Sequence, residues 1–394
     1  MGDSAPGPGG RGSGTTVAYV GAYTDRGKGI HLFRVDPADG GLVPWKVVDG
    51  PPNPSALAFA PSRKVLYAVN ERSGFGGGPA GSVAALAVDP ASGDLRPLNT
   101  VSSGGAGPTH LSIDPGGRFV YVANYGAGST AVLPVRPDGS LDEPSDVQSI
   151  EGPLGPQPAR DAPPGSYAVS GHDAPHAHMA QIDPGGRFLL VCDLGTDRIY
   201  AYAVDHRRGT LTPAAQPFVQ ASPGAGPRHL VFHPGGGWLY SLNEESSTLD
   251  VVRYAPESAA LTIRQSVSTL PAGFAGTNYP SEIAISADGR TVYAANRLHD
   301  TIALFAVDAP GDRVTPRGHV WTRGSYPRHM AIEPSGRFMY VLHSRSDNIT
   351  TFAVAPETGD LSFTGKYTPV GNPSQIAFLD LSARPEGNPA PPPS

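Results

Sequence analysis

Histidine, arginine and glutamate side chains gather at a few recurring positions of this sequence. Six of the twelve histidines stand at the start or the end of short apolar runs. Imidazole and carboxylate groups can take up and release protons in catalysis, and guanidinium groups bind anions strongly. Side chains of these types at equivalent positions therefore predict acid–base and electrostatic chemistry on an anionic small molecule. The charged positions are His110, His176, His178, His229, His329, His343, Arg228, Arg297, Arg328, Glu244 and Glu282.

The elements that must position these side chains follow from a ten-residue cassette that occurs six times. Each copy begins with a turn sequence, rich in Pro and Gly in most copies, and continues with β-branched and aromatic residues, which predicts a turn followed by a buried strand. The copies recur about every 50 residues, which is typical of a propeller or another repeat array. They are residues 61–70, 115–124, 184–193, 234–243, 287–296 and 334–343.

Each cassette is accompanied by three further strand-like segments, so one repeat predicts a four-stranded propeller blade. Residues 17–23 resemble a second strand that lacks a first strand, and residues 375–381 resemble an unpaired first strand. Joining the two chain ends in one blade removes the exposed sheet edges of a linear array. The sequence therefore predicts an all-β, seven-bladed β-propeller with four antiparallel strands per blade, closed by the N- and C-terminal strands in one blade. An open β-solenoid is the alternative that the matched termini disfavour.

The composition agrees with one domain over residues 16–382. The chain has 50 Gly and 43 Pro, which suits many turns, and no long segment has apolar residues at helical spacing. Residues 1–15 and 383–394 are predicted to be disordered tails because they hold too little apolar surface to offset the cost of ordering. The single cysteine, Cys192, lies in a predicted strand, where a buried thiol is expected.

The charge pattern and the chain ends exclude several classes of partner. A formal net charge of −6 gives no reason to expect nucleic acid. No apolar segment resembles a signal peptide or a membrane span, so a cytoplasmic protein with no membrane partner is expected. The oligomeric state stays open. Residues 146–175, rich in Pro, Gly and Ala, are predicted to form a loop that reaches over the site.

The start of a first strand and the end of a second strand lie at the same end of a blade, so the charged positions are expected to ring one mouth of the central channel. The recurring Asn70, Asn124, Asn243 and Asn296 are predicted to be strand-end residues with a structural role. For the histidines, both structural and functional roles remain open, and a functional role is favoured for His178, which breaks register by one residue. The three arginines indicate an anionic ligand or facing carboxylates. Compact metal-ligand spacings such as HExxH do not occur, which disfavours a metal site.

The motifs PHAHMAQIDPGGRFLLVCDLGTDRIYAY, GPRHLVFHP, LYSLNE and SEIAISADGRTVYAANR resemble those of the bacterial lactonase family of seven-bladed propellers. That family includes the propeller-type 6-phosphogluconolactonases and is similar to the fungal carboxymuconate lactonizing enzymes. The resemblance spans residues 17–381 and implies hydrolysis or formation of a lactone without a cofactor. It also implies the catalytic set His178 (or His176), Arg228, Glu244 and Arg297. The remaining mouth residues are predicted to bind substrate: His110, His176, His229, Glu282, Arg328, His329, Asn124, Tyr125 and His343.

Two departures from the family pattern bear on the substrate: VLHSRSDNI places His343 and Arg345 near the expected mouth, and Leu298 stands where a small residue is common. Three functions are therefore compared. The first is hydrolysis of 6-phosphogluconolactone or a related sugar or metabolite lactone. The second is lactone formation by a cycloisomerase or cyclase acting on a carboxylated metabolite. The third is a non-enzymatic propeller that binds a protein partner, which the charged, histidine-rich mouth disfavours. For the enzymes, the substrate is expected to be a small anionic lactone or carboxylate.

Overall fold

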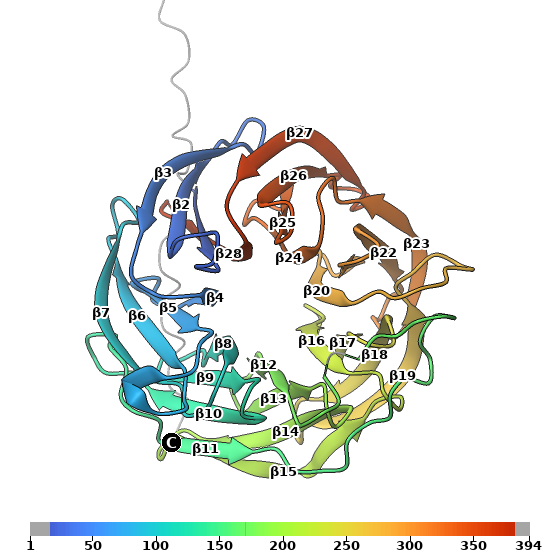
Figure 1. Ribbon diagram of the computed structural model, residues 1–394, viewed down its shortest axis with the longest axis horizontal. Helices are drawn as coiled ribbons and strands as arrows, with labels where there is room; N and C mark the ends of the chain where they lie inside the picture. The colour runs from blue at the N-terminus through green and yellow to red at the C-terminus, as the bar shows by residue number, and fades with distance from the viewer. Residues whose placement is uncertain (1–15, 170, 383–394) are drawn as a thin grey trace, which may run out of the picture.

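The computed structural model describes residues 16–169 and 171–382, and the two predicted tails lie outside these residues. The described chain forms seven four-stranded antiparallel sheets arranged around a central channel (Figure 1). The innermost strands are β28 (Pro373–Asp380), β4 (Pro54–Phe59), β8 (Pro108–Ile113), β12 (Ala177–Ile182), β16 (Pro227–Phe232), β20 (Pro280–Ile285) and β24 (Pro327–Ile332). The sheets are numbered blade 1, which contains β28, to blade 7, which contains β24.

The other three strands of each blade lie progressively further from the channel. The second strands are β1 (Thr16–Ala22), β5 (Val65–Asn70), β9 (Phe119–Asn124), β13 (Phe188–Asp193), β17 (Trp238–Asn243), β21 (Thr291–Asn296) and β25 (Phe338–His343). The third strands are β2 (Ile30–Val35), β6 (Ser82–Val88), β10 (Ser129–Pro134), β14 (Arg198–Asp205), β18 (Thr248–Ala255), β22 (Thr301–Val307) and β26 (Asn348–Val354). The outer strands are β3 (Leu42–Val48), β7 (Leu95–Ser102), β11 (Asp146–Ser149), β15 (Thr210–Gln220), β19 (Ala260–Ser268), β23 (Val314–Trp321) and β27 (Leu361–Pro369). A short 3₁₀ turn, η1 (Phe75–Gly77), precedes β6.

The closure predicted from the sequence is confirmed. β1 pairs antiparallel with β28 in blade 1, with Val17 opposite Leu379 and Tyr19 opposite Ala377. The blade thus joins the two ends of the chain, and Figure 1 shows β28 beside the blue N-terminal strands. Both termini of the propeller are thereby held in hydrogen-bonded strands.

The apolar core lies between neighbouring blades. Val65 and Tyr67 of blade 2, for example, pack in one cluster with Leu111 and Val120 of blade 3. Such clusters cover both faces of the second strands, so the sequences of these strands are nearly continuous apolar runs. This double burial is the physical reason for the repeated cassette.

A tyrosine in the cassette links adjacent blades. In five of the described blades, a second-strand tyrosine hydroxyl donates to the carbonyl oxygen of a hairpin glycine in the next blade, over 2.5–3.0 Å. These glycines have φ between 70° and 99°, a conformation that is strained for other residues. The pairs are Tyr19 with Gly93, Tyr67 with Gly139, Tyr240 with Gly311, Tyr293 with Gly359 and Tyr340 with Gly40.

The segment predicted as a loop over residues 146–175 differs at its start. Asp146–Ser149 forms β11, the outer strand of blade 3, because its backbone pairs with β10. The connection begins after it and runs across the next blades: Gly155 N–H donates to Gly195 O, and Gly276 N–H donates to Pro164 O. No helix within the described residues is long and apolar enough to cross a membrane.

Candidate active site

An irregularity at the start of the inner strands sets the direction of the candidate site residues. In blades 3, 4, 5 and 7, the first residue of the inner strand pairs with the last residue of the second strand, and pairing resumes two residues later. The intervening residue is the extra residue of a β-bulge, which re-aims a side chain. These extra residues are Thr109, His178, Arg228 and Arg328. His178 therefore occupies the same place as Arg228 and Arg328, which accounts for its break in register.

Two buried guanidinium groups share one carboxylate at the mouth. Oε2 of Glu244 lies 2.7 Å from Nε of Arg228 and 2.7 Å from an Nη of Arg297. The Arg228 contact is an ion pair rather than an aligned hydrogen bond, since its Nε has no partner of hydrogen-bond geometry. All three side chains are buried: the exposed fraction is 3 % for Arg228, 7 % for Glu244 and 6 % for Arg297. Two positive charges against one carboxylate leave this corner of the mouth with an excess of positive charge.

The excess charge changes the protonation of its neighbours. Burial, together with the charge of Arg297, lowers the pKa of Arg228 to about 10. Burial, reinforced by the charge of Arg228, holds the pKa of His178 and of His229 well below the ordinary value of 6.5. Both imidazoles are therefore neutral at pH 7, so each ring has one nitrogen with a lone pair.

The inner strands also bring further predicted residues together along the channel wall. His178 Nδ1 lies 3.1 Å from His229 Nε2, and His229 Nδ1 lies 3.0 Å from Glu282 Oε1. The other carboxylate oxygen of Glu282 is 3.3 Å from His329 Nε2. The His110 ring packs edge-on against His229 at 5.7 Å. Burial lowers the pKa of His110 to about 3 and that of His329 to about 4, so these rings are also neutral.

The third arginine lies at the mouth but has partners of its own. Arg328 hydrogen-bonds to the Tyr23 hydroxyl at 2.5 Å and lies 3.8 Å from Glu71. The Tyr23 hydroxyl donates in turn to Glu71 Oε2 at 2.5 Å. Arg328 and His178 are the bulge residues at the same end of their strands, and the positive charge of Arg328 helps to lower the pKa of His178. Tyr23 and Glu71 were not among the predicted catalytic or substrate-binding residues, although Glu71 follows Asn70 at a strand end as Glu244 follows Asn243.

His176 contacts its neighbours differently from His178. Its ring stacks on Tyr125 at 4.2 Å, and its Nδ1 and Nε2 contact Tyr125 O and Asp173 Oδ1 at 2.9 and 2.8 Å. Tyr125 also meets the His178 ring edge-on at 5.8 Å. His176 thus holds the aromatic residue that borders His178.

Two residues predicted to bind substrate lie outside this cluster. Asn124 is fully buried and donates to Ser103 O at 3.0 Å, as a strand-end residue with a structural role does. His343 takes the equivalent place in blade 7, where its ring packs against Gly324 and burial lowers its pKa to about 4. His343 is the last residue of its second strand and is fully buried there, so the structure does not bring it together with the clustered mouth residues. Arg345 does lie near the mouth, since its guanidinium stacks on Tyr326 at 4.1 Å, and Arg297 is 5.4 Å from the same ring.

A buried acid–histidine group beside the mouth was not predicted. His172, in the connection after β11, has Nδ1 2.8 Å from Glu245 Oε2 and Nε2 2.9 Å from Asp197 Oδ1. Its side chain is 0 % exposed. Gly171 N–H donates to the other oxygen of Glu245 at 2.6 Å. The group anchors the connection next to Glu244. No short sequence motif predicts it, because its three members are far apart in the sequence.

This group predicts a pH-dependent contribution to stability. Burial disfavours the charged ring, but hydrogen bonds to Asp197 and Glu245 outweigh it and raise the pKa of His172 to about 9. Unfolded histidine has a pKa of about 6.5. The stabilisation from His172 is therefore complete below about pH 6.5 and is lost as the pH rises through about 9. We expect the melting temperature of wild type to exceed that of His172→Gln most at pH 6, with the difference shrinking towards pH 10.

The matched control is Asn99→Ala, since the Asn99 amide hydrogen-bonds to the backbone of Leu141 and carries no titratable group. Its effect on melting should not vary over the same pH range. A difference between wild type and His172→Gln that is constant from pH 6 to pH 10 contradicts the assignment.

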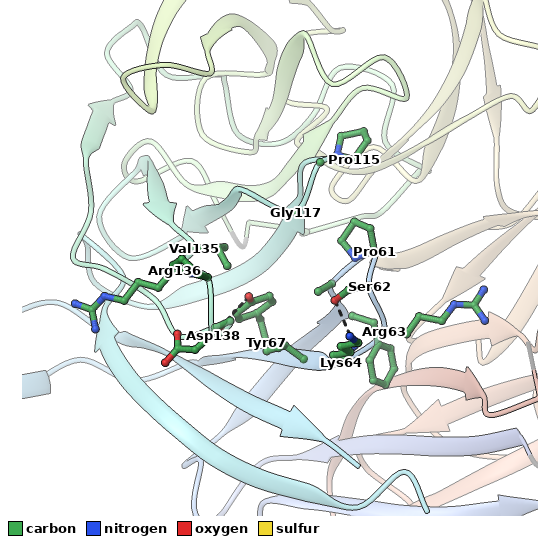
Figure 2. Close-up of a pocket in the computed structure, with 16 residues that line it drawn as sticks. Pro61, Ser62, Arg63, Lys64, Tyr67, Pro115, Gly117, Val135, Arg136 and Asp138 are labelled. Carbon is green, nitrogen blue, oxygen red and sulfur yellow. Dashed lines mark hydrogen bonds between the residues drawn. The ribbon is translucent and has the colours of Figure 1, made fainter. Parts of the chain in front are cut away.

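A cavity of about 750 Å³ lies at the opposite face, between the turns of blades 2 and 3 (Figure 2). Figure 2 shows Arg63 and Arg136 extending in opposite directions rather than converging on the space. A similar cavity of about 710 Å³ occurs at the turns of blades 5, 6 and 7, lined in part by Asp288 and Arg290. These spaces follow from the repeat of the blades, so the mouth remains the candidate site.

Comparison with known proteins agrees with this geometry. The chain matches the family model described as "Lactonase, 7-bladed beta-propeller" over residues 17–378. It is 34 % identical over 314 residues to the 6-phosphogluconolactonase of Bacillus subtilis (strain 168), which covers 78 % of this chain and 83 % of the relative. It is 32 % identical over 290 residues to the 6-phosphogluconolactonase of Erwinia tasmaniensis, covering 74 % and 77 %.

A solved structure shows the same likeness. The periplasmic gluconolactonase of Pseudomonas aeruginosa superposes with a TM-score of 0.83 at 33 % identity, covering 93 % of this chain and 99 % of that chain. The chain belongs to the lactonase family of seven-bladed β-propellers. Within the described residues, no set of three or more His, Cys, Asp and Glu side chains is placed to hold a metal ion.

Proposed function

We propose that this protein hydrolyses a sugar lactone, namely 6-phosphogluconolactone or a close relative, at the mouth of its channel. The observation that supports this most is the neutral imidazole of His178 beside a buried pair of guanidinium groups in a chain of the lactonase family. Hydrolysis of a lactone needs a base for water and positive charge for the developing oxyanion. The mouth offers both.

His178 serves as the general base and then as the general acid. Its imidazole takes a proton from water while the water oxygen bonds to the lactone carbonyl carbon. The carbonyl oxygen becomes an oxyanion, which the positive charge of Arg228 and Arg297 stabilises. When the tetrahedral intermediate collapses, the bond between the carbonyl carbon and the ring oxygen breaks. The ring oxygen receives the proton from the His178 imidazolium, and the open-chain acid leaves.

Glu244 holds the two guanidinium groups in place in this proposal. Its Oε2 is 2.7 Å from both Arg228 and Arg297. A carboxylate oxygen shared by two cations is a weak proton acceptor, because nearby positive charge favours the ionised form. Its contacts with two guanidinium groups suit Glu244 to electrostatic positioning, and proton transfer is assigned to His178, the neutral imidazole at the same mouth.

The substrate assignment is tested by comparing 6-phosphogluconolactone with unphosphorylated gluconolactone. Arg345 is exposed and stacks on Tyr326 at the rim, where it can meet a phosphate. A charge-assisted hydrogen bond contributes about 1.5–3 kcal/mol, so Arg345→Met should raise the KM for the phosphorylated lactone about tenfold. The KM for gluconolactone should stay unchanged. Proton release on hydrolysis, followed with a pH indicator, measures both.

The matched control is Arg323→Met, since Arg323 stacks on Trp321 at 4.4 Å away from the clustered mouth residues. It should leave both KM values unchanged. Equal effects of Arg345→Met on the two lactones contradict a phosphate contact. If wild type hydrolyses no sugar lactone but converts a muconate-like diacid to a lactone, the cycloisomerase alternative is correct, with the arginine pair binding carboxylates. If the protein turns over neither sugar lactones nor diacids, the binding-module alternative is favoured.

A further inference from the structure

Four side chains form an unbroken series of polar contacts along the channel wall, of which the first two are hydrogen bonds. They come from the inner strands of four consecutive blades: His178 on β12, His229 on β16, Glu282 on β20 and His329 on β24. The successive contacts are 3.1, 3.0 and 3.3 Å. The side chains of His229, Glu282 and His329 are only 10–11 % exposed, so water does not replace these contacts freely.

The partners of His229 determine which of its ring nitrogens carries the proton. Nδ1 faces the Glu282 carboxylate, which only accepts hydrogen bonds, so Nδ1 is protonated. Nε2 lies 3.4 Å from an Nη of Arg228, which only donates, so Nε2 carries a lone pair. Both partners favour the same tautomer, and Glu282 is the stronger of the two, since its contact is 3.0 Å and that of Arg228 is 3.4 Å. The low pKa of His229 excludes the doubly protonated ring at neutral pH.

The tautomer of His229 in turn sets that of His178. Because Nε2 of His229 is an acceptor, Nδ1 of His178, 3.1 Å away, must be the donor. His178 is neutral, so its Nε2 then carries the lone pair. Among the described residues, none hydrogen-bonds to this Nε2, and the atom is not enclosed by protein. The nitrogen left with the lone pair is thus the one open to the mouth.

We propose that Glu282 is a positioning residue that acts through His229 to keep the Nε2 of His178 unprotonated and directed to the substrate. The catalytic part of this proposal rests on the proposed lactone hydrolysis, but the tautomer assignment does not. The two carboxylates of the mouth thus have different roles. Glu244 aligns the guanidinium groups, and Glu282 orients the imidazoles.

A purely structural role for Glu282 makes a different prediction. Its Oε1 also accepts from its neighbour Ile283 N–H at 3.0 Å, and its Oε2 faces His329, so the residue could serve only to join blades. Loss of Glu282 would then lower stability without changing the tautomer of His178. The tautomer is therefore the decisive measurement.

The experiment is ¹⁵N NMR on histidine-labelled, ligand-free protein at pH 7.5, with His178 and His229 assigned from their single asparagine variants. In wild type, we expect both residues to show a protonated Nδ1 and an unprotonated Nε2. In Glu282→Met, which has a side chain of similar length but no acceptor, both should show mixed tautomers. Turnover should fall on the order of 10²-fold with little change in KM, since a base in the wrong tautomer cannot accept a proton.

Glu282→Gln is the conservative variant. Its amide oxygen can still accept from His229 while the amide nitrogen faces His329, so it should keep the wild-type tautomer of His178 and recover at least tenfold of the turnover lost in Glu282→Met. If Glu282→Met does not fold, Glu282→Thr is measured instead, because its short side chain keeps a polar group but cannot reach Nδ1 of His229, and it should give the same mixed tautomers. A protonated Nε2 of His178 in wild type overturns the proposal, as does a Glu282→Met protein with an unchanged tautomer. Absence of lactonase activity in wild type with the expected tautomers refutes the proposed function and leaves the assignment intact.

Discussion

Replacing His178 with asparagine is expected to lower the turnover of the lactone by roughly 10²–10⁴-fold, the usual contribution of a general acid–base group. The asparagine amide can overlay Nδ1 and still donate to Nε2 of His229, so the channel wall should keep its hydrogen bonds. The variant lacks the basic Nε2 that takes the proton from water. Substrate binding and melting temperature should therefore stay close to wild type while the single-turnover rate falls.

The matched control is His176→Asn. His176 stands two residues earlier, and its ring contacts Tyr125 O and Asp173 rather than the arginine pair. Its loss should reduce turnover by less than about tenfold, in line with an indirect role through Tyr125. If His176→Asn loses more turnover than His178→Asn does, the general base is His176, and its assignment to His178 is wrong.

Glu244→Gln is expected to cost about 3–5 kcal/mol of folding stability, the usual effect of breaking a buried ion pair by removing one partner. The substitution leaves Arg228 and Arg297 buried without the carboxylate that both contact at 2.7 Å. Their repulsion should also misplace the groups that stabilise the oxyanion, so KM should rise together with the loss of turnover. Chemical denaturation and steady-state kinetics on the same protein measure the two effects.

Lys46→Met provides the comparison, since Lys46 and Asp94 form an ion pair of the same 2.7 Å length with both side chains well exposed. An exposed pair contributes about 0–1 kcal/mol, so this variant should melt like wild type. If Glu244→Gln instead keeps wild-type stability and binding but loses turnover by 10²–10⁴-fold, Glu244 is the proton acceptor. The role given above to His178 is then wrong.

The fold could be predicted in detail because its signals are local and repeated. A second strand buried on both faces must be apolar over its whole length, and the turn before it requires residues suited to a tight turn, so the cassette recurs wherever a blade does. The unpaired segments at residues 17–23 and 375–381 indicated the closing blade, which the pairing of Val17 with Leu379 confirms. The same logic failed for residues 146–149. Their pairing with β10 is a tertiary contact with no apolar pattern in the strand itself.

The candidate site was predicted as a set of positions, and its internal contacts were not. Equivalent positions in a repeat point to the same region of space, which is why Arg228, Glu244 and Arg297 could be expected to meet. His343 follows the same pattern, but the structure buries it completely at the end of its second strand. Local sequence does not distinguish a strand-end side chain that turns inward from one that turns to the mouth.

The amino-acid sequence by itself determined the blade number, the way the ring closes and the end of the channel at which the charged residues gather, because each follows from short-range patterning repeated along the chain. Only the tertiary structure decided how these residues act on one another. The bulges that turn His178 and Arg228 from their strands, the carboxylate shared by Arg228 and Arg297, and the burial of His172 between Glu245 and Asp197 all join residues of different blades or loops. Protonation depends on burial and on charges a few ångströms away, and both are properties of the assembled ring.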